Sequence, residues 1–202
     1  MDDLGEVAHE AIERHVEEHF GPIEFVFHAM PSTGVHVLVV GPTADRPFRT
    51  LVTEGMSDQP MTVPDGVGPF AELMLCLPAD WPVEDLSADD SWPVHLLKYL
   101  AVFPHENGTW LGAWHLLPNG DPAVPYAPNT RFAGMVVTPV LMTGPQGREI
   151  DSAKGKIDLL AVVPLHPAEI RLKLEQGASA LIEAFDRAGV SELVDPRRPS
   201  SV

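Results

Sequence analysis

The sequence predicts an α/β protein of the α+β type, in which helices cover the faces of a single mixed, largely antiparallel sheet. Its 202 residues, 45% of them hydrophobic, suffice for one core. Helical periodicity occurs near both ends and once in the middle. Before the middle helix, consecutive strand-like runs are joined by short turns, whereas parallel neighbours need crossovers of a dozen or more residues. We expect one domain over residues 1–194 and a flexible C-terminal tail over 195–202.

The first expected element is a helix over residues 2–20. Its apolar residues recur every four positions: Leu4, Ala8, Ile12, Val16 and Phe20. Its glutamates lie on the opposite side and form an acidic, solvent-facing stripe: Glu6, Glu10, Glu13 and Glu17. Gly21 and Pro22 end the helix.

Four runs of strand length follow this helix, each bounded by turn residues. They are Ile23–His28, Val35–Val40, Phe48–Thr53 and Phe70–Leu77. The segment 54–69 is rich in glycine, proline and aspartate, and we expect a surface loop there.

The second half of the chain predicts two more helices and three more strands. A helix is expected at Pro93–Phe103, and strands at Trp110–Leu117, Phe132–Met142 and Ile157–Leu165. The residues 144–148 are typical of a hairpin loop. The final helix runs from Pro167 to about Gly189, with Gly177 in its middle at a cost of about 1 kcal/mol relative to alanine.

The charge balance restricts the class of partner. The chain carries 29 acidic and 13 basic residues, a formal net charge of -16. Such a field repels nucleic acid and anionic membranes and attracts a basic protein, although solubility alone also explains it. The acidic start of the chain and the lack of an apolar run of about 20 residues predict a cytoplasmic protein. The only cysteine, Cys76, lies in an apolar run and forms no internal disulfide.

Motifs of catalysis and metal binding are missing. The sequence contains no P-loop, no G-x-G-x-x-G and no G-x-S-x-G. His15 and His19 have the spacing of two metal ligands on one helical face, but no third ligand is evident. We therefore predict no catalytic residue, no metal and no cofactor.

One carboxylate and a group of tryptophans are the candidates for function. Strand alternation places Glu72 on the same face as Met74 and Cys76, so it lies at a sheet edge or is paired in the interior, and pairing is favoured. The tryptophans gather in one part of the chain, and either core packing or a protein interface explains them: Trp81, Trp92, Trp110 and Trp114. If residues 110–117 form a strand, Trp110 and Trp114 share a face.

Several segments in this order resemble one known family. The strand-like run 70–78 is followed by Trp92 and Pro93, by the apolar helix 96–101, and by the segment 107–115 that ends in Trp114 and His115. Residues 132–136 and 157–165 match two later strands. Over residues 20–190 the chain resembles the Suppressor of fused (SUFU-like) domain family in its bacterial, single-domain type.

The resemblance implies a non-catalytic protein-binding module. Animal members of the family clamp an extended peptide, partly through strand addition. Their clamp uses a second domain, which we expect to be missing here. Several bacterial single-domain members are thought to be immunity proteins that neutralise toxins, and a basic toxin suits this acidic chain. We predict partner contacts at Glu72, Trp110, Trp114 and His115, made through an acidic face or an exposed strand edge.

Two alternatives remain open. The chain could be a metal-binding protein or a hydrolase that uses His95 or His115 with Glu72. It could also be a small-molecule sensor, which leaves no trace in the sequence. The identity of the partner and the oligomeric state are left open as well.

Overall fold

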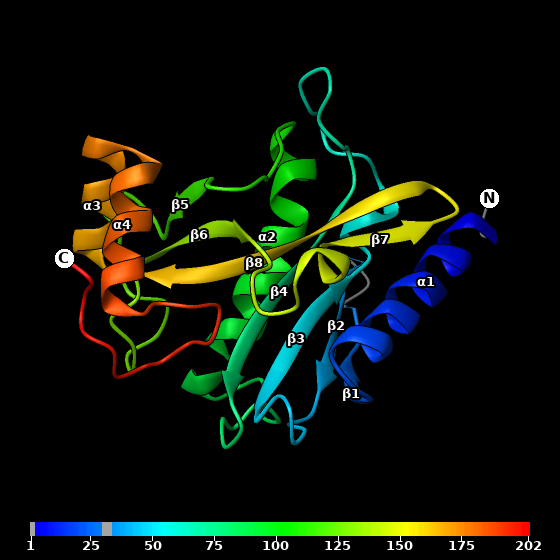
Figure 1. Cartoon of the computed structure of the whole chain (residues 1–202), viewed down its shortest axis with the longest axis horizontal. Coiled ribbons are helices and arrows are strands. Elements are labelled where there is room, and N and C mark those ends of the chain that lie inside the picture. The colour runs from blue at the N-terminus through cyan, green and yellow to red at the C-terminus, as the bar shows by residue number, and fades with distance from the viewer. Residues whose placement is uncertain (1–2, 30–33) are drawn as a thin grey trace.

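A mixed sheet of eight strands, flanked by helices, forms the centre of the computed structural model, which describes residues 3–29 and 34–202 (Figure 1). This confirms the predicted fold class. The helices are α1 (Asp3–His19), α2 (Trp92–Asn107), α3 (Pro167–Gln176) and α4 (Ala178–Ala188). The strands are β1 (Ile23–Phe27), β2 (His36–Val40), β3 (Phe48–Glu54), β4 (Ala71–Pro78), β5 (Leu116–Pro118), β6 (Gly134–Pro139), β7 (Glu149–Ser152) and β8 (Gly155–Leu165).

The sheet joins two antiparallel halves through one parallel pair. The strand order is β1-β2-β3-β4-β8-β6-β5, and β7 pairs with β8 outside this path. Strands β1 to β4 form an antiparallel meander, and β8, β6 and β5 are also antiparallel neighbours. Only β4 and β8 run parallel, with Leu73 opposite Leu160.

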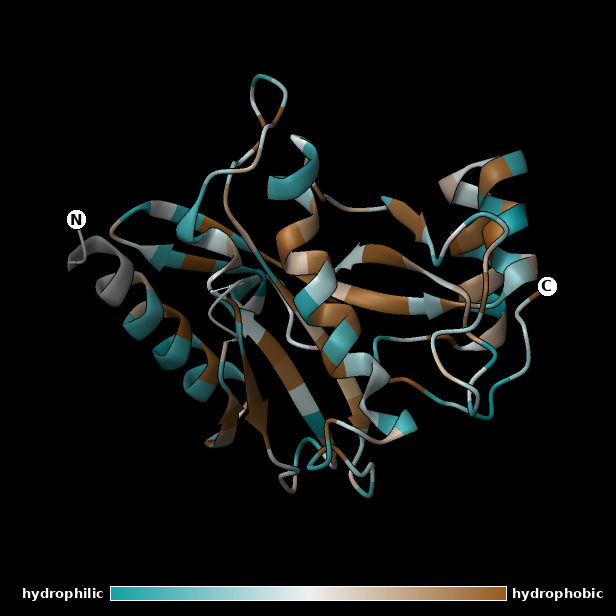
Figure 2. Ribbon diagram, turned by 180° about the vertical axis from the view of Figure 1, so that it is seen from behind, coloured by the Kyte–Doolittle hydropathy of each residue, from teal (hydrophilic) through white to brown (hydrophobic). Residues whose placement is uncertain are grey.

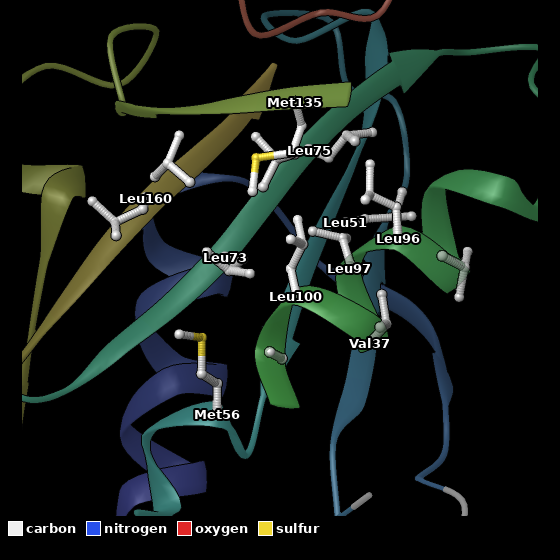
Figure 3. Close-up of a cluster of buried hydrophobic side chains, with 14 of the residues drawn as sticks. Val37, Leu51, Met56, Leu73, Leu75, Leu96, Leu97, Leu100, Met135 and Leu160 are labelled. Atoms are coloured by element: carbon white, nitrogen blue, oxygen red, sulfur yellow. The ribbon is translucent and has the colours of Figure 1, made fainter. Parts of the chain in front are cut away.

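Strand alternation divides the core between the two faces of the sheet. On one face Leu73 and Leu75 of β4 pack with α2, and Figure 3 shows this cluster. On the other face Met74 and Cys76 pack with α1. At the far end of that same face, Val136 and its neighbours pack with α3 and α4. Figures 1 and 2 show α2 on one side of the sheet, and α1 and the α3–α4 pair on the other. Because β4 is buried on both faces, its residues are apolar almost without a break.

The predicted final helix is two helices. Gly177 adopts φ 86° and ψ -178°, which ends α3 and starts α4. A residue with a side chain is strained at this positive φ, so the glycine permits a break, and the expectation of a continuous helix was wrong. Leu174 of α3 is 67% exposed, so the apolar face does not continue unbroken from α3 into α4.

The predicted strand 110–117 was also wrong over most of its length. Only residues 116–118 pair as a strand, because Trp114 has φ 69° and turns the chain. The predicted strand 132–142 is shortened to β6, and β7 was missed. Residues 145–148 form a 3₁₀ turn that leads into β7, and the hairpin turn lies instead between Ser152 and Gly155. In the expected loop 54–69, residues 56–58 form another 3₁₀ turn.

The C-terminal residues are held in place, in contrast to the expected flexible tail. Arg198 reaches the buried carboxylate of Glu169 on α3 with two nitrogens, at 2.5 and 2.8 Å, and donates to the Pro164 carbonyl at 2.9 Å. Its guanidinium lies 5.0 Å from the centre of the Phe132 ring. The backbone N–H of Ser201 also donates to Glu169, at 2.8 Å. No helix in the described part of the chain is long and apolar enough to cross a membrane.

We predict that Arg198→Ala lowers the free energy of unfolding by about 3 kcal/mol at neutral pH, because it leaves the buried Glu169 carboxylate without its cation. Burial acts to raise the pKa of Glu169, but hydrogen bonds from Arg198, Ser201 and His166 outweigh it and hold the pKa below its usual value. The stabilisation is therefore present above the ordinary carboxyl pKa and lost as the pH falls below it.

Urea unfolding followed by tryptophan fluorescence, at neutral pH and in acid, measures this effect. Arg197→Ala is the matched control, since it removes the same charge from an exposed neighbour. Equal losses in the two variants would contradict the assigned role of Arg198.

Candidate functional site

Glu72 is a fully buried carboxylate that closes a loop. It accepts hydrogen bonds from the hydroxyls of Thr53 and Ser57, at 2.6 and 2.7 Å, and from the N–H groups of Gly55 and Ser57, at 3.1 and 3.0 Å. Burial raises its pKa, and these hydrogen bonds oppose the rise. The structure confirms the predicted pairing in the interior. The 0% exposure of the residue leaves no surface for direct contact with a partner.

A second buried carboxylate, Glu54, joins α1 to the sheet. One of its oxygens lies 3.7 Å from Nδ1 of His9, and the other is buried without a hydrogen bond in the described part of the chain. Burial raises the pKa of Glu54 to about 7. Asp58 lies 3.2 Å from Nε2 of His9 and 3.1 Å from Nζ of Lys154, and its hydrogen bond raises the pKa of His9. These groups connect α1, the end of β3 and the β7–β8 hairpin.

Trp110 and His115 lie together on the α2 side of the sheet. Their ring centres are 4.2 Å apart, and Trp110 is half-buried against the core under α2. A Cβ at Gly112 would meet the indole at 2.4 Å, so this close packing requires glycine there. Trp110 also borders a hollow of about 280 Å³, together with Arg148 and Asp158.

Trp114 lies on the other face of the sheet, against the core under α3 and α4. The backbone N–H of Trp114 donates to the Val137 carbonyl at 2.6 Å, which fixes the turn at Trp114. The expectation that Trp110 and Trp114 share a face was therefore wrong. Glu72 follows the alternation of Met74 and faces away from Trp110, so the four predicted contact residues form no common site.

The histidines form no metal site in the described residues. No group of three or more His, Cys, Asp or Glu side chains is arranged to hold an ion within residues 3–29 and 34–202. His15 is buried and lies 3.4 Å from the Gly147 carbonyl, and burial lowers its pKa. His95 lies 3.0 Å from the Leu86 carbonyl. The alternative that joins His95 or His115 with Glu72 has no shared site, because both histidines lie on the α2 side of the sheet, whereas the buried Glu72 side chain faces the other side.

The candidate site that the structure adds is a groove beside α2, with a volume of about 370 Å³. Trp92 and Tyr126 stack beneath it, with ring centres 5.5 Å apart and planes 4° from parallel. Tyr99 of α2 is a large residue that is 52% exposed to solvent. The lining residues come from three segments: Leu86, Ser87, Ala88, Asp89, Ser91, Trp92, His95, Leu96, Tyr99, Asn119, Tyr126, Ala127 and Pro128.

The edge of this groove is acidic. Its lining contains Asp89 but no lysine or arginine. The adjoining loop 79–91, the acidic loop, also carries Asp80, Glu84, Asp85 and Asp90. Asp85 is bound to the N–H and hydroxyl of Ser87, and these hydrogen bonds lower its pKa. The groove therefore has aromatic walls and an acidic rim formed by Asp89 and, through Ser87, by Asp85, whereas Asp80 and Asp90 border a different hollow.

The acidic loop is held in position by its own hydrogen bonds. The indole of Trp81 donates to the Asp90 carbonyl at 2.8 Å, and the Ser91 hydroxyl donates to the carbonyls of Leu86 and Ala88. A second hollow, of about 380 Å³, lies on the other side of the loop, and Trp92 borders both hollows.

Sequence reasoning missed this groove because its parts are far apart in the chain. Trp92 was noted as one of four tryptophans. The signal that could have found the groove is the sequence of acidic residues that leads directly into the aromatic start of α2. The contribution of Tyr126 follows only from the fold.

A protein-family model and solved structures match the chain. The family model for Suppressor of fused protein (SUFU) matches residues 32–199. Among curated proteins, none matches the chain by sequence.

Three of the similar structures carry the same family name. A protein described as a SUFU homologue from Neisseria gonorrhoeae FA 1090 has a TM-score of 0.71 at 15% identity, and the match covers 96% of this chain and 97% of that one. The structure of a Sufu–Fu complex has a TM-score of 0.67 at 13% identity, and the match covers 96% of this chain and 92% of that one. Drosophila Suppressor of Fused has a TM-score of 0.65 at 14% identity, and the match covers 96% of this chain and 51% of that one. At these identities the structures show a shared fold.

We predict that Glu54→Gln makes the protein more stable than the wild type in mild alkali, by about 2 kcal/mol at about pH 8. The pKa of Glu54 rises from 4.5 to about 7 on folding, so the folded state holds a proton that the unfolded chain has released. The free energy of unfolding therefore falls as the pH rises through this window, and the variant lacks that fall.

Urea unfolding at several pH values between about 5 and 8 measures the difference. The two proteins should agree at the acidic end and separate at the alkaline end. Glu17→Gln, on the exposed side of α1, is the control and should keep the pH dependence of the wild type. A variant at Glu54 that follows the wild type at every pH would refute the prediction.

Proposed function

Because the chain belongs to the Suppressor of fused family, we propose that it is a non-catalytic protein-binding module that recognises a positively charged partner. The observation that carries this proposal is the groove beside α2, which combines exposed aromatic surface with an acidic rim. Aromatic anchors beside complementary charge are typical of protein interfaces. One of the similar structures is a complex of Sufu with Fu, which supports protein binding as the family's mode of action.

The net charge of -16 supports the choice of partner. It attracts a basic protein over a long range and speeds the encounter at low ionic strength. The groove then supplies what the general charge does not, a defined surface with apolar contacts.

We place the protein in the cytoplasm as an immunity protein that binds and neutralises a basic toxin. A tight complex with a basic toxin would block the toxin without any chemistry in the immunity protein. A protein of this kind needs a rigid surface for its partner, and the hydrogen bonds within the acidic loop support such rigidity. The oligomeric state in the complex is a matter for the same experiment.

The test is capture of the partner from the native host by the tagged protein, at about 0.05 and about 0.5 M salt, with identification by mass spectrometry. We expect one specific basic protein, retained at low salt and weakened at high salt. The double variant Asp85→Lys with Asp89→Lys should weaken binding of that purified partner at least about tenfold, because Asp89 lines the groove and Asp85 is hydrogen-bonded to the lining residue Ser87.

The matched control is Glu13→Lys with Glu17→Lys on α1, which changes the net charge equally on the opposite face of the sheet. It should lower the association rate slightly and keep most of the affinity. Recovery of no specific protein at either salt concentration would overturn the proposed function. Equal losses in the two double variants would show that net charge, and not the groove, carries the binding.

A further inference from the structure

We propose that the groove beside α2 seats an arginine side chain of the partner, an inference that rests on the proposed function and specifies it. The groove has the volume of a small-ligand pocket, and its lining is about as rich in apolar groups as in polar ones. An arginine side chain matches this mixture, because three methylene groups precede its charged, planar end.

The aromatic groups of the groove favour a planar cation. Trp92 and Tyr126 form a parallel stack, and Tyr99 stands at the open side with half of its surface exposed. Because Trp92 is only 4% exposed and is covered by Tyr126, the ring open to a guanidinium is that of Tyr99, which offers a π face on which a planar cation stacks. An ammonium group is compact and strongly hydrated, so lysine gains less from the same rings.

The charges of the groove favour the same ligand. Asp89 is the one carboxylate in the lining, and Asp85 of the acidic loop is hydrogen-bonded to the lining residue Ser87. A carboxylate accepts two parallel N–H bonds from a guanidinium, and a neutral or acidic side chain cannot supply them. Since Lys98 of α2 donates to the His28 carbonyl at 2.9 Å, at the end of β1, it is directed to another part of the surface.

A second copy of this chain fits the groove less well. It would bring the same excess of 16 negative charges to an acidic rim, and the two molecules would repel each other. The observations therefore favour a different protein that presents an arginine in an extended segment. The NMR titration described next also tests self-association, because self-association would make the amide signals depend on protein concentration.

The experiment titrates the isotope-labelled full chain with a blocked five-residue peptide, Gly-Ala-Arg-Ala-Gly, and follows the backbone amide signals by NMR. We expect shifts confined to the groove, at residues 86–99, Asn119 and residues 126–127. The same peptide with citrulline, which has the shape of arginine without its charge, should bind at least about tenfold more weakly. The lysine peptide should fall between the two.

Three variants test the assigned contacts. Asp89→Asn and Tyr99→Ala should each weaken the arginine peptide about five- to tenfold, whereas Tyr99→Phe, which keeps the ring, should retain most of the affinity. Glu17→Gln on α1 is the control for charge and should leave binding unchanged. Because Asp89 and Tyr99 are exposed, these substitutions leave the core intact.

The inference is overturned if the arginine peptide gives no localised shifts at millimolar concentration, or if citrulline binds equally well. Shifts spread over the acidic stripe of α1 would mean general charge attraction, and shifts that depend on protein concentration would mean self-association. Each of these also overturns it. Its failure differs from failure of the proposed function: a partner that still depends on the acidic loop but not on Tyr99 would leave the protein-binding role in place.

Discussion

The parallel pairing of β4 with β8 is the constraint on which the rest of the architecture depends. Parallel neighbours cannot be joined by a tight turn, so a long connection that includes α2, β5, β6 and β7 separates the end of β4 at Pro78 from the start of β8 at Gly155. The long connection supplies α2, the outer strands of the second half and the acidic loop. The groove beside α2 is therefore a product of this connection, and its walls come from two parts of it, residues 86–99 and residues 119–128.

Buried carboxylates give this acidic protein its ordered loops. Glu72 binds the N–H groups of the turn after β3, and Glu169 binds those at the start of α3 and in the C-terminal segment. Glu192 accepts from the N–H groups of Leu141 and Met142. Each satisfies backbone donors that a loop would otherwise leave to water. Glu54 differs, since one of its oxygens has no such donor in the described structure and burial dominates its pKa.

Parts of the candidate site were visible in the sequence and others were not. The alternation of residues 70–77 placed Glu72 in the interior and paired, because a strand buried on both faces leaves a carboxylate few other choices. The same reasoning failed for Trp110 and Trp114, because a residue with positive φ interrupts the alternation, and nothing in the local pattern marks Trp114 for that conformation. Tyr126 could not be assigned to the groove at all, since it meets Trp92 across 34 residues of sequence.

The sequence by itself determined the class of fold, the helical and strand segments with clear periodicity, the charge of the surface and the family resemblance. These follow from local spacing and composition, which act within a turn of helix or along a single strand. Only the tertiary structure decided the strand order, the break at Gly177, the anchoring of Arg198 on Glu169, and the groove with its acidic rim. All four depend on contacts between distant segments or on a backbone conformation that the surrounding packing imposes, and periodicity carries no information about either.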